Sequence, residues 1–254
     1  GTGALVAWVE VPALADATNT DLYIYYGNSS ASSQQNATGV WDSNYKSVWH
    51  MEEQSGVTLS DSTTFFDGTK LSSTEPNPIS AQINYGQSFD GTNDWVDIGT
   101  NKNILNSVAA TTLEAWVNIN NSTSSRLALF ASINGSNTSA RALMLFNSAE
   151  QVQVGGRSTD AEVLQSETTS SAISTGTWHQ VVGVIDYAND NVVIYIDGAS
   201  VGTTGTPAFS STSTPATDST SVEMGSNNRG LSSPFLGSLD EVRISNNVRS
   251  ATWI

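Results

Sequence analysis

The sequence predicts an all-β fold built from antiparallel strands, and three observations lead to this prediction. Helical periodicity is nearly absent along the 254 residues. Apolar and polar residues alternate in residues 113–119 (LEAWVNI) and 191–196 (NVVIYI), which is the period of a half-buried strand. Turn-forming pairs separate such runs, namely Asp67-Gly68, Asp90-Gly91, Asn134-Gly135, Gly155-Gly156 and Asp197-Gly198. Many short strands with frequent turns are typical of a sandwich or a barrel.

The remaining segments follow from local composition. Residues 194–201 predict a hairpin around Asp197-Gly198, and the Ser/Thr/Pro-rich residues 203–221 predict a long surface loop. Residues 29–38 are small and polar, which indicates a linker. The stretch before this linker holds two strand-like runs, residues 5–11 and 22–26. Because two strands rarely form an independent domain, we expect them to dock on the main body or to belong to a neighbouring domain.

Charge and composition exclude several classes of function. The chain carries 9 Lys+Arg against 24 Asp+Glu, a net charge of −15, so nucleic acid and anionic membrane surfaces are not expected partners. The absence of cysteine excludes zinc-thiolate sites, iron–sulfur clusters and a cysteine nucleophile. No apolar run is long enough for membrane insertion. Abundant Ser, Thr, Asn and Gly with 13% charged residues favour an extracellular or cell-surface location.

An ordered set of motifs resembles the laminin G-like, concanavalin A-like superfamily. These motifs are residues 88–99 (SFDGTNDWVDIG), 112–117 (TLEAWV), 178–184 (WHQVVGV), 193–198 (VIYIDG) and 235–244 (FLGSLDEVRI) with Arg249-Ser250. Residues 8–12, 22–28 and 40–53 resemble the end of an uncharacterised β-rich domain that precedes this sandwich in prokaryotic surface proteins, and the junction after it. We therefore expect residues 1–38 to be the C-terminal remnant of that domain plus a linker, and residues 39–254 to be the sandwich.

The resemblance implies a jelly roll of two antiparallel sheets, extracellular recognition of glycans or proteins, and often one structural Ca²⁺. The same superfold hosts glycoside hydrolases, whose carboxylates follow the pattern Glu-x-Asp-x-x-Glu on one strand. No Glu in this chain has that spacing, no Gly-x-Ser-x-Gly elbow is present, and His50 and His179 each stand beside Trp in a strand. We therefore expect no catalysis, and the alternative is a polysaccharide lyase of this fold, which would need a Tyr/His/Arg cluster.

Candidate Ca²⁺ ligands are oxygen donors in Asp-, Asn- and Gly-rich loops. By the resemblance, Asp240 is the principal candidate, joined by Asp61, Glu52 and the carbonyl of Gly91. The alternative is that Asp240 caps a loop or pairs with Arg243 or Lys46. The carboxylate surplus suits a divalent cation, and it equally suits a soluble surface protein without one.

Candidate glycan-binding residues are planar polar or aromatic side chains in loops: Arg157, Asn227, Asn228, Arg229 and Trp95. The leading hypothesis is a non-catalytic binding module for a glycan or cell-surface glycoconjugate, placed between flanking domains of the same polypeptide in a secreted or surface-attached, adhesin-like protein. The second hypothesis is a structural spacer in a surface or filament protein. The third is a glycoside hydrolase or lyase with unusual catalytic residues.

Overall fold

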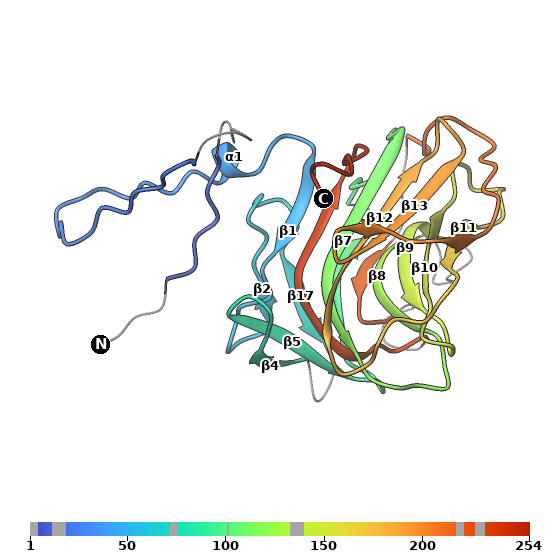
Figure 1. The fold of residues 1–254 in the computed structure, drawn as a ribbon, viewed down its shortest axis with the longest axis horizontal. Coiled ribbons are helices and arrows are strands. Elements are labelled where there is room, and N and C mark those ends of the chain that lie inside the picture. Colours follow the sequence, from blue (N-terminus) through green and yellow to red (C-terminus); the bar gives the residue numbers. More distant parts are fainter. Residues whose placement is uncertain are drawn as a thin grey trace.

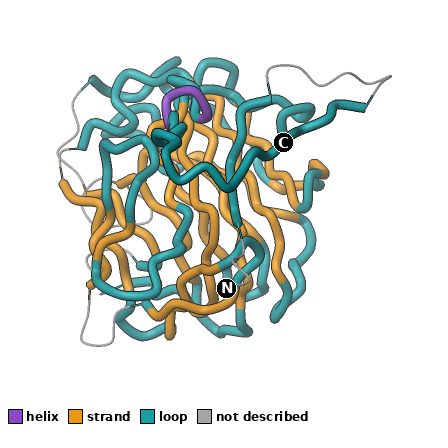
Figure 2. The backbone as a smooth tube through the Cα atoms, turned by 90° about the vertical axis from the view of Figure 1, so that its left-hand side faces the viewer, coloured by secondary structure: helices purple, strands orange, loops and turns teal. Residues whose placement is uncertain are grey.

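The computed structural model describes residues 5–11, 19–71, 76–100, 102–132, 140–216, 221–226 and 232–254. Within these residues the strands form two antiparallel sheets that pack face to face (Figure 1). The prediction of an all-β antiparallel sandwich is therefore confirmed. Among the described residues the helix is α1 (Ala37–Val40), a single turn that lies at one end of the sandwich (Figure 2). No helix in this part of the chain has the length and apolar character needed to cross a bilayer.

The first sheet is centred on two long strands, β7 and β17. Its strands, in spatial order, are β14 (Ala199–Ser200), β13 (Asn191–Ile196), β12 (Trp178–Asp186), β7 (Ala110–Ile119), β17 (Leu236–Ser245), β5 (Tyr85–Asp90) and β4 (Asn77–Ser80). The second half of β17 pairs with β1 (Tyr45–Trp49), while its first half pairs with β5. The last strand in the chain therefore lies in the middle of this sheet.

The second sheet covers the inner face of the first. In spatial order it contains β15 (Thr203–Thr204), β11 (Gln165–Thr169), β10 (Val152–Gly156), β9 (Ala140–Phe146), β8 (Arg126–Ser132), β16 (Ser221–Met224), β6 (Trp95–Thr100), β3 (Gly68–Leu71) and β2 (Thr58–Leu59). The predicted loop at residues 203–221 is largely irregular where described, but β15 at its start pairs with β11.

The core lies between the sheets and follows the alternation of the sequence. Leu113 and Val117 of β7 are fully buried in it, as are Met144 of β9 and Val154 of β10. Each fully buried aliphatic side chain of this kind contributes about 1.5–3 kcal/mol. Because side chains alternate along a strand, the residues between the core positions of β7 project to the outer face of the first sheet. That outer face carries the polar groups considered below.

Two predicted turns have different outcomes. Asp197-Gly198 joins β13 to β14, and its φ values of 52° and 79° are those of a two-residue hairpin turn, so this prediction is confirmed. The predicted turn at Gly155-Gly156 is wrong, because both residues lie in β10. A Cβ on Gly155 would stand 2.3 Å from the carbonyl oxygen of Gln165 on β11. Glycine is required there by the close approach of two strands, which local sequence does not distinguish from a turn.

The two strand-like runs near the start of the chain are not strands in this structure. Residues 5–11 and 22–26 have no regular structure, and residues 22–26 extend away from the sandwich (blue in Figure 1). Tyr25 and Tyr26 are 92% and 94% exposed. A strand needs a neighbour for its backbone hydrogen bonds, and none of the described residues supplies one. The prediction from β-propensity therefore failed for lack of a pairing partner.

Candidate functional site

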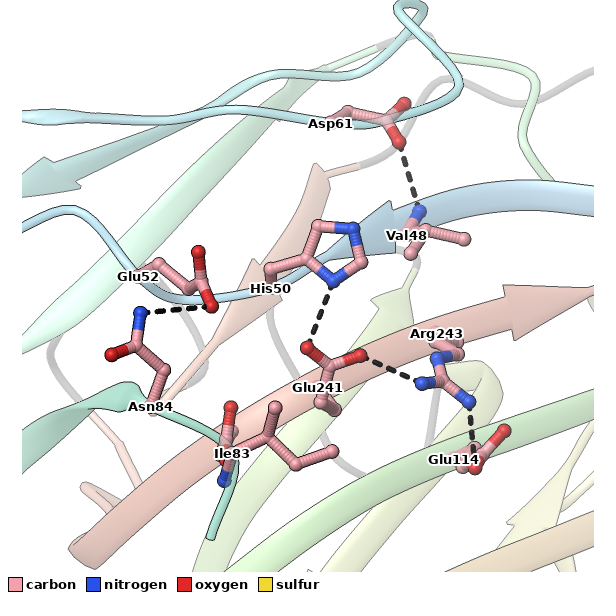
Figure 3. A network of polar contacts seen from close by, with 10 residues as sticks. Val48, His50, Glu52, Asp61, Ile83, Asn84, Glu114, Glu241 and Arg243 are labelled. Carbon is pink, nitrogen blue, oxygen red and sulfur yellow. Dashed lines mark hydrogen bonds and ion pairs between the residues drawn. The ribbon is translucent and has the colours of Figure 1, made fainter. Parts of the chain in front are cut away.

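A buried polar network crosses the outer face of the first sheet (Figure 3). Glu114 on β7 lies opposite Arg243 on β17, with Oε1 and Nη1 3.1 Å apart. Arg243 Nη2 contacts Glu241 Oε2 at 2.7 Å, and Glu241 Oε1 is 2.8 Å from His50 Nδ1. Gln180 Nε2 donates to Glu114 Oε1 and extends the network onto β12. The network therefore ties together three neighbouring strands, β12, β7 and β17, with His50, the residue that follows β1.

The charges in this network are paired with one another. Burial alone would lower the pKa of the Arg243 guanidinium, but the carboxylates of Glu114 and Glu241 raise it above its ordinary value. Burial, together with the charge of Glu114, raises the pKa of Tyr45 to about 12, so this phenol stays neutral. An efficient general acid needs a pKa near neutral pH, which this phenol does not have. Two carboxylates bound to one guanidinium are suited to holding strands together rather than to proton transfer.

Aromatic rings cover the end of the network nearest β1. Trp8 stacks on His50 with ring centroids 3.6 Å apart. The Trp41 ring lies 5.2 Å from the Arg243 guanidinium, close enough for a cation–π contact. These contacts attach residues 5–11 and the segment after α1 to the sandwich. The attachment rests on aromatic packing rather than on strand pairing.

Asp240, the principal predicted Ca²⁺ ligand, is fully buried on β17 beside a bulge at Glu241. Its Oδ2 accepts a hydrogen bond from the backbone N–H of Ile83 at 2.8 Å, as a loop-capping carboxylate would. Its Oδ1 is buried and has no partner within the described residues. Burial, with added effects of the Glu241 and Glu52 charges, raises the pKa of Asp240 to about 7. A buried carboxylate oxygen without a donor is an atom that a bound cation would satisfy.

The other predicted ligands are divided among different places. Glu52 lies close enough to Asp240 for its charge to act there, and its Oε1 accepts from Asn84 Nδ2 at 3.2 Å. Gly91 follows β5, whereas Asp240 stands beside Gly86 near the start of that strand. Both oxygens of Asp61 are already engaged, by donors on Val48, Thr63, Phe65 and Phe66.

Only some of the predicted ligands could therefore bind one Ca²⁺ ion together. The described residues contain no group of three or more His, Asp or Glu side chains arranged to hold a metal ion. Calcium takes six to eight oxygen ligands and accepts backbone carbonyls and water among them. Asp240 and Glu52 fit as two carboxylate donors, since one has an unsatisfied buried oxygen and the other lies near it. Asp61 does not fit, because its hydrogen bonds to the loop use its acceptor capacity.

The predicted glycan-binding residues are not brought together at an open surface. Trp95 in β6 is 8% exposed and offers little ring surface to a ligand. Arg157 is 7% exposed, and its Nη1 donates to the carbonyls of Asp160 and Glu162, so it organises its own loop. Asn227, Asn228 and Arg229 lie outside the described residues. Trp95 and Arg157 are unsuited to ligand binding because they are buried. The local sequence around them does not indicate this burial.

A pocket of about 680 Å³ lies beside α1, at a place that the sequence reasoning missed. We call it the α1 pocket. Its apolar wall contains Trp41, Tyr45, Phe65, Phe66, Ile104 and Val108, and its polar lining includes Asp42, Lys46, Lys102, Asn103, Asn106 and Asn246. Phe65 is 73% exposed. The adjacent pair Phe65-Phe66 in a polar loop was the one sequence signal that could have indicated this site.

A second group of side chains links the ends of β12 and β13. His179 Nδ1 is 2.8 Å from Asp197 Oδ2, and His179 Nε2 is 2.7 Å from Ser174 Oγ. A Ser-His-Asp triad uses the same connections. Here Asp197 Oδ1 also accepts from the backbone N–H of Gln180, and the Ser174 hydroxyl is shared with Thr177 Oγ1 at 2.7 Å. These bonds fix the hairpin turn against the preceding loop, which agrees with a structural His179.

The family model for the concanavalin A-like lectin/glucanase superfamily matches residues 90–254. The chain belongs to this superfamily. The jelly-roll interpretation of the two sheets is thereby confirmed. The model for a domain of unknown function (DUF2341) matches residues 1–77 of this chain. This match agrees with the resemblance of the first part of the sequence to an uncharacterised β-rich domain. No curated protein sequence is significantly similar to the chain.

Solved structures with the same fold come from proteins of different activities. Trypanosoma rangeli sialidase has a TM-score of 0.57 at 13% identity over 84% of this chain, which spans about a third (32%) of the sialidase. Domain 4 of AbnA, a GH43 extracellular arabinanase from Geobacillus stearothermophilus, solved with arabinotriose, has a TM-score of 0.57 at 17% identity, covering 83% of this chain and 96% of that domain.

The receptor-binding domain of a botulinum neurotoxin C/D mosaic serotype has a TM-score of 0.60 at 12% identity, covering 82% of this chain and 49% of that one. Identities this low establish the shared fold alone, and fold does not determine function. The fold is one of a carbohydrate-related type, and the choice between binding and catalysis depends on the site.

Proposed function

We propose that the chain is a non-catalytic glycan-binding module of an extracellular or surface-attached protein, and that the α1 pocket is its binding site. One observation carries the proposal. The pocket combines an exposed Phe65 ring and Trp41 with the amide side chains of Asn103 and Asn106. The C–H faces of a sugar ring pack on aromatic rings, and its hydroxyls pair with planar amides. A volume of about 680 Å³ suits a short oligosaccharide.

Two further facts support a binding role. The similar AbnA domain is nearly the same size as the matched region and was solved with arabinotriose. The carboxylates on the outer face of the first sheet are bound to Arg243 instead of standing as an acid pair. A cell-surface glycoconjugate is therefore the expected partner, and neighbouring domains of the same polypeptide would present the module to it.

The test is a glycan array probed with the intact chain and with Phe65→Ala. Removing an exposed ring costs little stability, because Phe65 is 73% exposed. We expect Phe65→Ala to weaken glycan binding by about tenfold or more, as loss of a central aromatic contact does. Val163→Ala is the matched control, since Val163 is 75% exposed and does not line the pocket. Failure of the intact chain to bind any glycan would favour the structural spacer instead.

We further propose that Asp240 and Glu52 contribute to a structural Ca²⁺ site. The unpartnered Oδ1 of Asp240 supports this, and the ion would neutralise the buried Asp240 carboxylate, whose pKa is raised by burial and by the charges of Glu241 and Glu52. Calcium should raise the melting temperature of the intact chain and leave that of Asp240→Asn unchanged. Equal melting temperatures of the intact chain in EDTA and in Ca²⁺ would exclude the site.

A further inference from the structure

We propose that the α1 pocket selects acidic glycans, those whose sugar ring carries a carboxylate. This inference rests on the proposed glycan-binding function and adds the charge class of the ligand. It starts from the distribution of cations. The chain has three lysines, Lys46, Lys70 and Lys102, against a net charge of −15. Lys70 on β3 is 3% exposed, and the other two both line the α1 pocket.

Both pocket lysines are available to a ligand. Lys46 Nζ donates to the backbone carbonyl of Ser43 at 3.3 Å and to the side-chain oxygen of Asn246 at 3.2 Å, and because both acceptors are neutral its charge stays uncompensated. Among the described residues, no carboxylate lies within ion-pair distance of Lys46 or Lys102. In a strongly anionic chain, two uncompensated ammonium groups that line one pocket create a local positive potential that attracts anions.

The carboxylate that lines the pocket is compensated by its own partner. Asp42 accepts from both terminal nitrogens of Arg249, at 2.7 and 3.0 Å. The Arg249 guanidinium holds the pKa of Asp42 below its ordinary value, so the pair stays ionised and neutral as a unit. The charges that remain for a ligand are therefore the two ammonium groups.

The apolar wall determines what kind of anion fits. A simple anion such as acetate or phosphate would use the lysines and leave the rings of Phe65 and Trp41 uncovered. A carboxylated sugar uses both features, because its C–H face packs on a ring while its carboxylate meets an ammonium group. The combination of two lysines that have no ion-pair partner among the described residues with exposed aromatic surface thus points to an acidic saccharide.

The experiment is calorimetric titration of the intact chain with trigalacturonate, triguluronate and sialyllactose, each compared with its methyl ester. The ester keeps the ring and removes the charge. We expect at least one acid to bind about tenfold more tightly than its ester, since partly exposed ion pairs contribute modestly each. This preference for acid over ester should decrease between about 0.1 M and about 1 M salt, because the Debye screening length falls from about 10 Å to about 3 Å.

Substitutions locate the effect. Lys46→Gln and Lys102→Gln should each reduce the preference for acid over ester, while Phe65→Ala should weaken acid and ester alike. Ser200→Glu is the control, because it changes net charge by the same one unit on β14, at the opposite edge of the first sheet from β1. If Ser200→Glu reduces the preference as much as the lysine substitutions do, the effect is one of overall charge and the inference fails.

The outcomes separate the two proposals. Equal, Phe65-dependent binding of acids and esters would overturn acidic selectivity and leave glycan binding standing. Acetate or phosphate competing at the same concentration as the saccharide would show a general anion site and overturn the inference. No binding of any acid or ester, together with a blank glycan array, would overturn both.

Discussion

Asp240 makes the stability of the metal-free chain depend on pH in an unusual direction. Its carboxyl is fully buried, and its pKa is about 7 in the folded state against 3.8 for an ordinary Asp. The folded chain therefore holds a proton that the unfolded chain releases. This contribution to stability is fully present below about pH 4 and is lost as the pH rises to and through 7. Replacing Asp240 with Asn removes the titration while keeping the shape of the side chain.

The size of the effect follows from the difference between the two pKa values. Each pKa unit corresponds to about 1.4 kcal/mol, so the free energy of unfolding should fall by roughly 4 kcal/mol between pH 4 and pH 8 because of Asp240. Asp240→Asn should lack this decrease. Its stability relative to the intact chain should therefore rise with pH, even though its amide leaves a buried donor that costs about 1–3 kcal/mol at every pH.

The assay is urea unfolding followed by tryptophan fluorescence in EDTA, at several pH values between 4.5 and 8. Asp21→Asn is the matched control, because it removes an exposed carboxylate outside the sandwich. The informative quantity is the difference between the intact chain and each variant, which cancels the titration of the other carboxylates. A difference between intact chain and Asp240→Asn that stays constant across this range would refute the reasoning.

Three further predictions concern other features. Arg243→Met should lower the free energy of unfolding by about 3–5 kcal/mol, because it leaves Glu114 and Glu241 buried without their cation; chemical denaturation measures this, and a loss below about 1 kcal/mol would contradict a paired network. Gly155→Ala should destabilise the chain by about 1–3 kcal/mol through its clash with the β11 backbone, which thermal unfolding would detect; an unchanged melting temperature would show that the strands can separate freely. Ser174 should not react with a fluorophosphonate probe, as expected of a structural hydroxyl, and labelling lost in Ser174→Ala would instead reveal a hydrolase.

The fold could be predicted from the sequence because its signals are local. Residues 113–119 alternate with the period of a strand, and Asp197-Gly198 has the residue types of a tight hairpin turn. The failures arose where a distant segment decides the outcome. Gly155 looks like a turn until β11 is brought against it, and residues 22–26 look like a strand although none of the described residues pairs with them.

The candidate site was harder to predict because its parts are far apart in the chain. The α1 pocket joins Trp41, Phe65, Lys102 and Asn246, which only the packing of several loops brings together. Asp240 was identified through the family motif, and the structure adds its unpartnered oxygen. Trp95 was selected for its residue type, which does not reveal that the ring is buried.

The position of β17 has a consequence for how the chain is made. Residues 236–245 insert between β7 on one side and β5 and β1 on the other, so the first sheet cannot close during synthesis until this segment has left the ribosome. Until then β7 and β5 present unpaired edges that can join other nascent chains. Chains truncated within residues 236–245 should therefore aggregate, because the edges of β7 and β5 then stay unpaired.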